Sequence, residues 1–433
     1  MIESPRASGL VAAARESSLA KKVVLAYSGG LDTSVAIRWL QEERGYDVVA
    51  LTIDLGNEKD LRTVEQRALQ IGAIKAIVRD GKRPFIDYFA FPALMAGAVY
   101  EGQYLLATAI GRPLIARMLV DVAREEGATA IAHGCTGKGN DQVRFDVATQ
   151  SLAPDLEIIA PVREHRMSRE EQIEWAAERN VPVPTTKASP YSTDENLWGR
   201  SIEAGVLEDP WAAPPEDIYA WTKSPADAPD TPREVEISFV HGRPVALDGH
   251  EMDGVTLVQT LNQWAGEHGV GRTDLVEDRL IGIKSREVYE APAAWTLHNA
   301  HEALEQLTLS KHQLRVKNSL RQEYADLIYN GLWFTAHHQD LAAYVQSTQR
   351  FVTGDVRMRL FKGHATPVGK KSPKSLYSYA LATYDRGDQY DQSSAVGFIK
   401  IWGLPVSQQA RTQLLSEGAE PFQLGTTADG SST

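Results

Sequence analysis

Short apolar runs alternate with stretches of helical periodicity in the first part of the chain, and this alternation constrains the fold most. VVLAYS, DVVALTID and AIKAIVRD look like strands, whereas DTSVAIRWLQEE and LRTVEQRALQIG carry apolar residues at helical spacing between them. ATAIAHG and LEIIAPV continue the series of strands. Strands that are apolar on both sides belong in a parallel sheet with helices on both faces. The sequence therefore predicts an α/β domain built on a doubly wound, mostly parallel sheet.

The first predicted strand turns into its helix through AYSGGLDTS, residues 26–34. The first N–H groups of a helix lack partners within it, and the helix dipole favours negative charge there. Gly29 and Gly30 let the backbone approach an oxyanion closely. Three hydroxyl side chains add donors: Ser28, Thr33 and Ser34. The stretch predicts a phosphate site, although it matches neither G-x-G-x-x-G nor the Walker sequence. The alternative is an ordinary Gly-Gly turn.

Asp32 is the unexpected member of this stretch, because a carboxylate beside a bare phosphate would repel it. Its presence makes sense if Mg²⁺ lies between the two groups, or if the carboxylate caps backbone N–H groups of the loop. Mg²⁺ binds mainly through substrate oxygens and one or two carboxylates. We therefore expect Mg²⁺ with the phosphates and no metal site made by the protein alone.

A second glycine-rich stretch, HGCTGKGNDQVRF at residues 133–145, follows another predicted strand. The spacing excludes a Walker P-loop, but the loop remains tolerant of anions. Lys138, Asn140, Asp141 and Arg144 bring both charges and an amide to it, which suits a zwitterionic ligand. The alternative is a solvated glycine loop. A histidine in such a loop, here His133, is more often structural than catalytic.

Proline density marks the predicted exit from the first domain. NVPVPTTKASP, from Asn180, holds three prolines, which places a boundary near residue 188. Beyond it, EVEISFVHGRPVALDG reads as two strands around a His-Gly-Arg turn, and long helical patterns follow, which is typical of an α+β domain. VSQQARTQLLSEG could form one exposed helix. The predicted division is a flexible tail (1–20), a nucleotide-binding domain (21–188), an α+β domain (189–403), and a C-terminal helix with a disordered tail (404–433).

Charge and cysteine content exclude several classes of protein. The formal net charge is -12. Proteins that bind the negatively charged backbone of nucleic acids usually carry positive charge, so nucleic acid is not an expected partner. Cys135 is the only cysteine, which excludes an intrachain disulfide and favours a reducing cytoplasm. The first 20 residues lack the apolar core of a secretory signal, and no run of 18 apolar residues occurs. We expect a cytoplasmic protein without a membrane segment.

Four motifs, in this order along the chain, resemble the argininosuccinate synthase family within the PP-loop ATP pyrophosphatases: AYSGGLDTS, HGCTGKGNDQVRF, YSTDENLWGRS and IGIKSREVYEAP. The resemblance covers about residues 22 to 400. It implies a PP-loop domain like that of the adenine nucleotide alpha hydrolases, followed by a synthetase domain. It further implies an ATP-driven ligase that joins L-citrulline to L-aspartate in arginine biosynthesis, releasing AMP and pyrophosphate through a citrullyl-AMP intermediate. Members form homotetramers in which a C-terminal helix reaches a neighbour.

The resemblance also implies roles for individual residues. Those matching the ATP site are Ala26, Tyr27, Ser28, Gly29, Gly30, Leu31, Asp32, Thr33, Ser34, Ile53 and Gly134. Those matching the aspartate site are Thr136, Asn140 and Asp141. Those matching the citrulline site are Tyr104, Thr108, Asn140, Arg144, Ser192, Ser201, Glu277 and Tyr289. The candidate catalytic residues are Asp32, Asp141 and Arg144.

Three positions depart from the family pattern. Ala109 stands where many relatives carry a hydroxyl near the citrulline carboxylate, and Thr108 beside it could compensate. Cys135 replaces a small residue, and Asp278 replaces an amide next to Glu277. None of them removes a charge that the chemistry needs, so the departures bear on substrate affinity. Two alternatives remain at this point, a PP-loop enzyme that modifies tRNA and a non-enzymatic nucleotide sensor.

Overall fold

The computed structural model describes residues 21–56, 60–183 and 190–415. The chain divides into two compact units, 1–376 and 377–433, which are described separately. The predicted tail at 1–20 and the last part of the predicted tail after 404 lie outside the described residues, as does the predicted boundary near 188. The four-part division of the chain stays a prediction.

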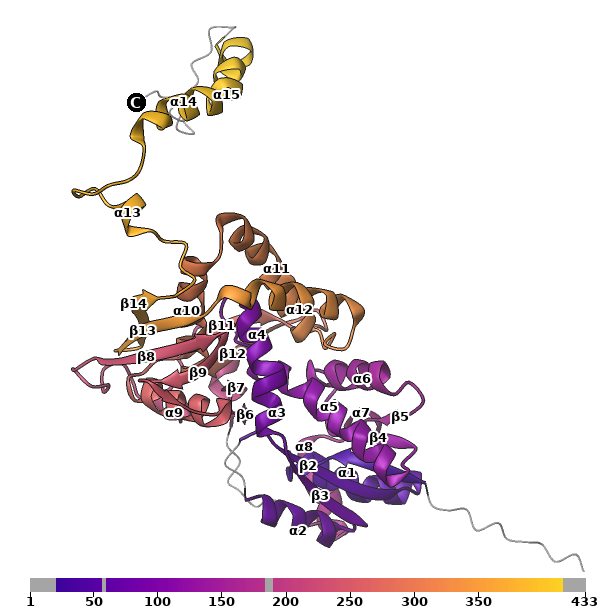
Figure 1. Ribbon diagram of the computed structural model, residues 1–433. Helices are drawn as coiled ribbons and strands as arrows, with labels where there is room; N and C mark the ends of the chain where they lie inside the picture. The colour runs from indigo at the N-terminus through magenta and orange to yellow at the C-terminus, as the bar shows by residue number, and fades with distance from the viewer. Residues whose placement is uncertain (1–20, 57–59, 184–189, 416–433) are drawn as a thin grey trace, which may run out of the picture. The chain divides into compact units, whose positions relative to one another are not determined.

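The first sheet contains five strands in the order β3-β2-β1-β4-β5, and every neighbouring pair is parallel (Figure 1). Its strands are β1 (Lys22–Ala26), β2 (Asp47–Asp54), β3 (Lys75–Asp80), β4 (Ala130–His133) and β5 (Glu157–Ile159). Leu25 of β1 lies opposite Ala50 on one side and Ala132 on the other. The predicted parallel sheet is confirmed.

Helices cover both faces of this sheet. They are α1 (Leu31–Arg44), α2 (Leu61–Ile71), α5 (Ala107–Glu126), α6 (Asp141–Leu152), α7 (Pro161–His165) and α8 (Arg169–Glu178). Val23 and Leu25 pack against α1, α2 and α8, whereas Val24 between them packs against α5 and α6. Successive side chains of a strand point to opposite faces. The apolar strands are therefore covered by helices on both faces of the sheet. The predicted doubly wound arrangement is confirmed.

Two antiparallel sheets follow, as the predicted α+β part requires. One has the order β11-β12-β7-β6 and the other β10-β9-β8-β13-β14. The strands of the first are β6 (Ser192–Asn196), β7 (Gly199–Glu203), β11 (Arg272–Asp278) and β12 (Lys284–Glu290). Those of the second are β8 (Arg233–Val240), β9 (Arg243–Leu247), β10 (His250–Glu251), β13 (Gly354–Phe361) and β14 (His364–Lys371). The predicted hairpin is confirmed, since Val240 pairs with Arg243 and both turn residues, His241 and Gly242, have positive φ.

The remaining helices of this unit are α3 (Lys82–Phe85), η1 (Ile86–Ala90), α4 (Phe91–Ala96), η2 (Gly205–Glu208), η3 (Glu216–Ile218), α9 (Gly254–Glu267), α10 (Pro292–Thr308), α11 (Lys311–Tyr329), α12 (Ala336–Thr348) and η4 (Gln349–Phe351). Most of them close one core that joins the two halves of the unit, while η2 and η3 contribute Leu207 and Ile218 to a smaller cluster. Leu106 at the start of α5 packs in the same cluster as Trp198 and Leu297. Trp198 Nε1 also donates to the Leu105 carbonyl at 3.1 Å. Because α5 belongs to both cores, it ties the nucleotide-type sheet to the antiparallel sheets.

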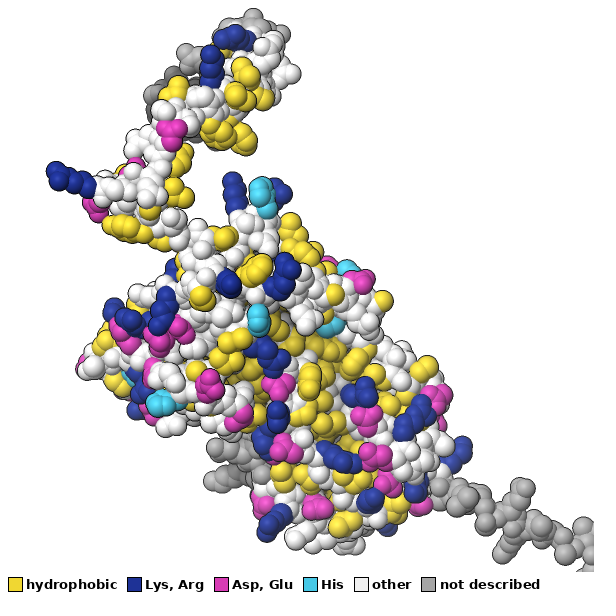
Figure 2. Space-filling model, viewed as in Figure 1, with side chains coloured by type: hydrophobic (Ala, Val, Ile, Leu, Met, Phe, Trp, Pro, Cys, Tyr) yellow, Lys and Arg dark blue, Asp and Glu magenta, His cyan; other side chains and the backbone are white. Residues whose placement is uncertain are grey.

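The second unit consists of α13 (Tyr379–Ala382), α14 (Gln392–Trp402), α15 (Leu404–Gln409) and η5 (Ala410–Leu414). The helix predicted from VSQQARTQLLSEG corresponds to α15 and η5, while α14 was not predicted. Large apolar side chains of these helices are exposed within the unit, among them Phe398 at 62%, Ile401 at 70% and Trp402 at 73% (Figure 2). No helix in the described parts of the chain is long and apolar enough to cross a membrane.

Candidate active site

A cavity of about 260 Å³ lies where β1, β2 and β4 end at the same edge of the parallel sheet. The strand order reverses between β1 and β4, and α/β sheets bind ligands at such a switch point. Its lining includes Ser28, Gly30, Asp32 and Thr33 from the first loop, and His133, Gly134, Cys135 and Asp141 from the second. The two glycine-rich stretches singled out in the sequence thus meet at one cavity.

The loop after β1 is shaped to bind an anion. Gly29 has φ +78°, a backbone conformation that residues other than glycine rarely adopt. Gly30 directly precedes α1. No described side chain caps the first turn of α1, so its N–H groups are available to a ligand. Ser28 Oγ and Thr33 Oγ1 lie 3.2 Å apart. This arrangement supports the predicted phosphate site.

A cation on α2 also reaches this loop. Arg67 Nη1 donates to the Gly29 carbonyl at 2.8 Å, which fixes the peptide whose positive φ forms the turn. Nothing in the sequence motif pointed to Arg67, because it lies 38 residues beyond Gly29.

The loop after β4 packs directly on the first loop. A Cβ atom at Gly134 would lie 2.8 Å from Thr33 Cγ2, so only glycine fits there without a shift. Gln142 Nε2 donates to the Gly137 carbonyl at 2.7 Å and holds the loop over α6. Both ring nitrogens of His133 are engaged, with Nε2 2.7 Å from an Asp146 oxygen and Nδ1 accepting from the Cys135 N–H at 3.3 Å. His133 is therefore a structural residue of the loop.

Asp141 lies between two arginines at the start of α6. Arg112 Nη2 donates to Asp141 Oδ2 at 2.7 Å, and Arg144 Nη1 donates to Oδ1 at 2.9 Å. Burial acts to raise the pKa of Asp141, but Arg112 and Arg144 outweigh it and lower this pKa to about 2. Asp141 is therefore ionised at neutral pH and is a poor proton acceptor. Arg112 also pairs with Asp194 of β6, which connects the two halves of the unit.

Tyrosine and carboxylate side chains form a second group of site residues. Tyr289 and Tyr329 both donate to Glu277, the latter at 2.6 Å. Asn140 Nδ2 donates to the Tyr329 hydroxyl at 2.8 Å, and Asn140 Oδ1 accepts from the Leu280 N–H at 2.9 Å. The glycine loop of the first half is thereby fastened to the β11–β12 hairpin of the second.

Arg144 belongs to this part of the site as well. It is 4% exposed, and its Nε donates to the Tyr329 carbonyl at 2.8 Å. Its buried Nη2 has no hydrogen-bond partner among the described residues. An unpartnered guanidinium N–H in this position is suited to donate a hydrogen bond to a substrate oxygen.

The residues matched to citrulline by resemblance come together, apart from one. The Tyr104 ring stacks on Tyr289 with centroids 4.2 Å apart, and Thr108 Oγ1 lies 3.2 Å from Ser201 Oγ. Ser192 lies at the start of edge strand β6 and is exposed.

Thr136, matched to aspartate, is likewise exposed on its loop. The predicted nucleotide residues Ala26, Tyr27 and Ile53 line the cavity, whereas Gly29, Leu31 and Ser34 do not. Ser34 forms a hydrogen bond with the Tyr27 hydroxyl at 3.2 Å instead.

The three departures from the family pattern have simple structural accounts. Ala109 is buried, and its N–H donates to the Tyr104 hydroxyl at 3.2 Å, so the backbone keeps a polar contact there. Burial raises the pKa of the Cys135 thiol, which leaves it uncharged and unreactive at neutral pH. Asp278 is exposed and pairs with Lys284 at 2.7 Å, away from Glu277.

Sequence reasoning missed four residues of the site: Arg112, Asp194, Tyr329 and Glu287. Arg112 and Tyr329 become visible only through partners distant in the sequence, since 82 residues separate Arg112 from Asp194 and 52 separate Glu277 from Tyr329. Asp194 and Glu287 do lie inside the motifs YSTDENLWGRS and IGIKSREVYEAP. That position was the one signal that could have indicated them.

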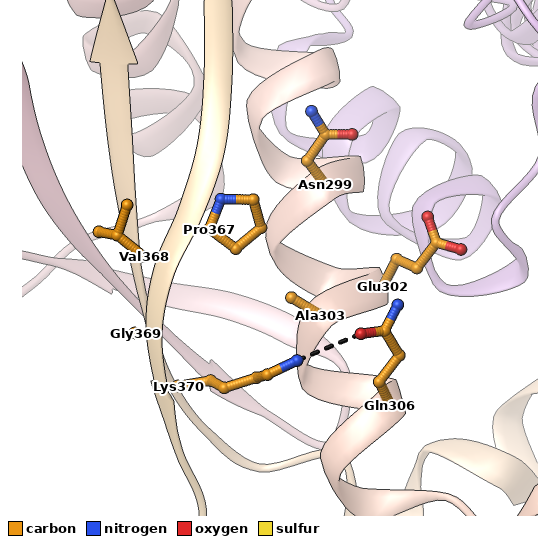
Figure 3. Close-up of a pocket in the computed structure, with 8 residues that line it drawn as sticks. All are labelled: Asn299, Glu302, Ala303, Gln306, Pro367, Val368, Gly369 and Lys370. Carbon is orange, nitrogen blue, oxygen red and sulfur yellow. Dashed lines mark hydrogen bonds between the residues drawn. The ribbon is translucent and has the colours of Figure 1, made fainter.

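A wider hollow of about 480 Å³ lies between α10 and β14 (Figure 3). It is lined by Asn299, Glu302, Ala303, Gln306, Pro367, Val368, Gly369 and Lys370. Lys370 Nζ donates to Gln306 Oε1 at 3.1 Å across it. None of the predicted site residues lines this hollow, so its size does not make it the active site.

The parallel sheet with a glycine-rich anion loop at its switch point defines a nucleotide-dependent enzyme of the PP-loop class. The model for the arginosuccinate synthase N-terminal HUP domain matches residues 22–182, and that for the arginosuccinate synthase C-terminal domain matches 191–409. The chain belongs to the argininosuccinate synthase family, a family of ligases that form C–N bonds.

Curated relatives agree with this membership over nearly the whole chain. The argininosuccinate synthase of Dehalococcoides mccartyi strain 195 is 56% identical over 399 residues, which cover 92% of this chain and 98% of the relative. That of Brevibacillus brevis is 56% identical over 390 residues, covering 90% and 93%. That of Symbiobacterium thermophilum is 56% identical over 394 residues, covering 91% and 98%. The predicted family is confirmed, and the alternatives of a tRNA-modifying enzyme and a nucleotide sensor are set aside.

Proposed function

We propose that this chain condenses L-citrulline with L-aspartate at the expense of ATP, forming argininosuccinate, AMP and pyrophosphate as a step of arginine biosynthesis. The observation that carries the proposal is the meeting of the anion loop at residues 26–34 with Arg112 and Asp141 at one cavity, where Asp141 also pairs with Arg144. The loop supplies a place for phosphates, and the cluster supplies charges for amino-acid substrates.

We assign the residue roles from the resemblance of the sequence motifs. ATP lies on Ala26 to Ser34, with Ile53 and Gly134 along the nucleotide. Aspartate is held by Thr136, Asn140 and Asp141. Citrulline is held by Tyr104, Thr108, Asn140, Arg144, Ser192, Ser201, Glu277 and Tyr289. The direct contacts among Tyr104, Glu277, Tyr289 and Asn140's partner Tyr329 support a single citrulline pocket.

The chemistry needs activation before the C–N bond forms, because a urea oxygen is a poor leaving group. The ureido oxygen of citrulline attacks the α-phosphorus of ATP, and pyrophosphate leaves with the electron pair of the broken P–O bond. The aspartate amine then attacks the ureido carbon, and AMP leaves with the former ureido oxygen. The protein contributes placement and charge neutralisation, and orientation alone has a ceiling of roughly 7 to 11 kcal/mol.

The amine must also lose a proton. The low pKa of Asp141 and the two engaged nitrogens of His133 make both residues poor acceptors. We therefore assign the proton to a phosphate oxygen of the departing AMP. Asp141 and Arg144 act through charge and position, not through proton transfer.

Mg²⁺ is proposed as the cation that accompanies ATP. No cluster of three or more His, Cys, Asp or Glu side chains in the described ranges could hold a metal ion. Mg²⁺ is commonly held by substrate phosphates with one or two carboxylates, and Asp32 at the cavity wall fits that part. When bound, it offsets the charge of the departing pyrophosphate.

A coupled assay of pyrophosphate formation tests the proposed activity. We expect release only when ATP, citrulline and aspartate are all present, and its loss when any one is omitted. Citrulline carrying ¹⁸O in its ureido group should pass the label to AMP. Label that stays in argininosuccinate would contradict the adenylated intermediate.

Asp141→Ala tests the assignment of aspartate. Removal of the carboxylate leaves Arg112 and Arg144 facing each other, so we expect KM for aspartate to rise at least ~10-fold, about 1.4 kcal/mol, with a smaller rise for citrulline. Asp278→Ala is the matched control, because the Asp278 carboxylate pairs with exposed Lys284, and both KM values should stay unchanged. Equal increases for the two substrates in Asp141→Ala would refute the assignment.

A cytoplasmic homotetramer is proposed as the working form. The exposed apolar side chains of α14 and α15, such as Ile401 and Val406, support an association of chains, since large exposed apolar patches mark interaction sites. Light scattering of the full chain should give the mass of four copies. The mass of one chain would contradict the tetramer.

A further inference from the structure

The hydroxyl group of Tyr289 lies between two carboxyl groups. It contacts Glu277 Oε2 closely and lies 3.1 Å from Glu287 Oε2. A phenol has one proton, and an ionised carboxylate has none. Tyr289 can therefore donate fully to one carboxyl group only. A proton on the other carboxyl group would make the second contact a full hydrogen bond as well.

Glu277 is the acceptor of the pair. Tyr289 donates to one of its oxygens, and Tyr329 donates to the other at 2.6 Å. Burial raises the pKa of Glu277 above its usual value, although Tyr289, Tyr329, Arg144 and Arg279 act to lower it. With both oxygens already accepting phenolic protons, Glu277 has the surroundings of a carboxylate.

Glu287 has the surroundings of a carboxylic acid. Its side chain is 15% exposed, and its Oε1 accepts from Arg279 Nη2 at 3.3 Å, an arginine that also pairs with Glu203. Its charged neighbours are Glu277 on β11, Glu203 on β7 and Arg279 after β11, with Tyr289 on its own strand. Burial, Glu277 and Glu203 raise the pKa of Glu287 to about 8, because Arg279 offsets only part of their effect.

We propose that Glu287 is a positioning residue that, as a neutral acid, donates its proton to the Tyr289 oxygen and so directs the Tyr289 proton to Glu277. Glu277 then presents one ionised carboxylate in a fixed orientation to the α-ammonium group of citrulline. Glu287 itself touches no substrate. The inference rests on the proposed function, in which Glu277 and Tyr289 hold citrulline.

Substitution of Glu287 by an amide and by an apolar side chain separates the possible roles. In Glu287→Gln the amide N–H replaces the acid O–H, so we expect KM for citrulline within ~3-fold of the parent at pH 7. In Glu287→Leu no donor remains, and loss of one such hydrogen bond should raise this KM ~10-fold or more, with KM for ATP unchanged. Glu234→Gln, at an exposed position of β8, is the control and should change neither value.

Two results would overturn the proposal. If Glu287→Gln alone raised KM for citrulline ~10-fold, Glu287 would be an ionised group that binds the ammonium directly. If Glu287→Leu raised the KM values of all three substrates equally, the residue would only support the fold.

A measurement without substrate tests the proton itself. A folded-state pKa raised above the usual value of a glutamate gives stability that is present at low pH and lost as pH rises to about 8. The melting temperature of the parent should therefore fall relative to Glu287→Gln between pH 5 and pH 8.5. Parallel curves would overturn the proposal even if the citrulline-dependent assay succeeds. Diverging curves together with a failed assay would instead reject the proposed function and keep the proton on Glu287.

Discussion

Replacement of Arg112 by leucine should lower kcat/KM by about 10³-fold, the upper end of what one lost donor to developing charge costs in an active site. Arg112 lines the cavity and pairs with both Asp141 and Asp194. Without it, two carboxylates face each other across the place where phosphate charge develops. The loss should therefore appear in kcat as well as in KM.

The charge on Arg112 is secure, so its geometry decides the outcome. Burial acts to lower the pKa of the Arg112 guanidinium, but Asp141 and Asp194 raise it well above its usual value. Arg112→Lys keeps the charge and loses the planar fork that bridges two carboxylates. We expect this variant to recover only about one tenfold step of the loss, since Lys is a point charge on a flexible stem.

Arg117→Leu is the matched control for this prediction. Arg117 lies on the same helix, 55% exposed, and pairs with Asp121 at 2.9 Å on the surface. Exposed pairs of this kind contribute about 0 to 1 kcal/mol. Pyrophosphate release and circular dichroism, measured together, separate catalysis from folding. A folded Arg112→Leu enzyme within tenfold of the parent would show that the bridge has no part in the reaction.

Local pattern was sufficient to predict the parallel sheet and its loops. Strands such as β1 are buried on both faces, and the switch between periods of 2 and 3.6 residues marks each strand-to-helix turn. Gly29 and Gly134 also carry their meaning locally, because positive φ and close backbone approach need glycine. Most of the predicted nucleotide-site residues lie in the continuous stretch 26–34, which local pattern singles out, and their role stays a prediction.

Long-range pairing was not predictable from the residues themselves. Arg112 sits in an ordinary helical pattern, and its meaning comes from Asp194 on another sheet. Tyr329 ends α11 and reaches Glu277 through tertiary packing alone. The helix α14 was missed for a different reason, because QSSAVGFIKIW has apolar residues on most of its faces and lacks the polar face by which surface helices are recognised.

Replacement of Lys317 by methionine should lower the free energy of unfolding by about 3 to 5 kcal/mol, the usual cost of leaving one buried charge unpaired. Lys317 is 1% exposed on α11, and its Nζ donates to Glu305 Oε2 at 2.9 Å. Burial raises the pKa of Glu305, but His301 and Lys317 outweigh it and hold this pKa below its usual value. Methionine fills the space of lysine but leaves Glu305 as a buried anion.

A second substitution at the partner should reverse most of this loss. In Lys317→Met with Glu305→Gln, the amide oxygen still accepts from Gln349 Nε2, which donates to Glu305 at 2.8 Å in the parent, and no buried charge remains. Urea midpoints followed by tryptophan fluorescence at pH 7.5 compare the variants, with exposed Lys311→Met on the same helix as the control. KM values should stay unchanged throughout, since neither residue lines the active-site cavity. If the double variant were no more stable than Lys317→Met, the loss would come from packing around α11, and the buried ion pair would not explain it.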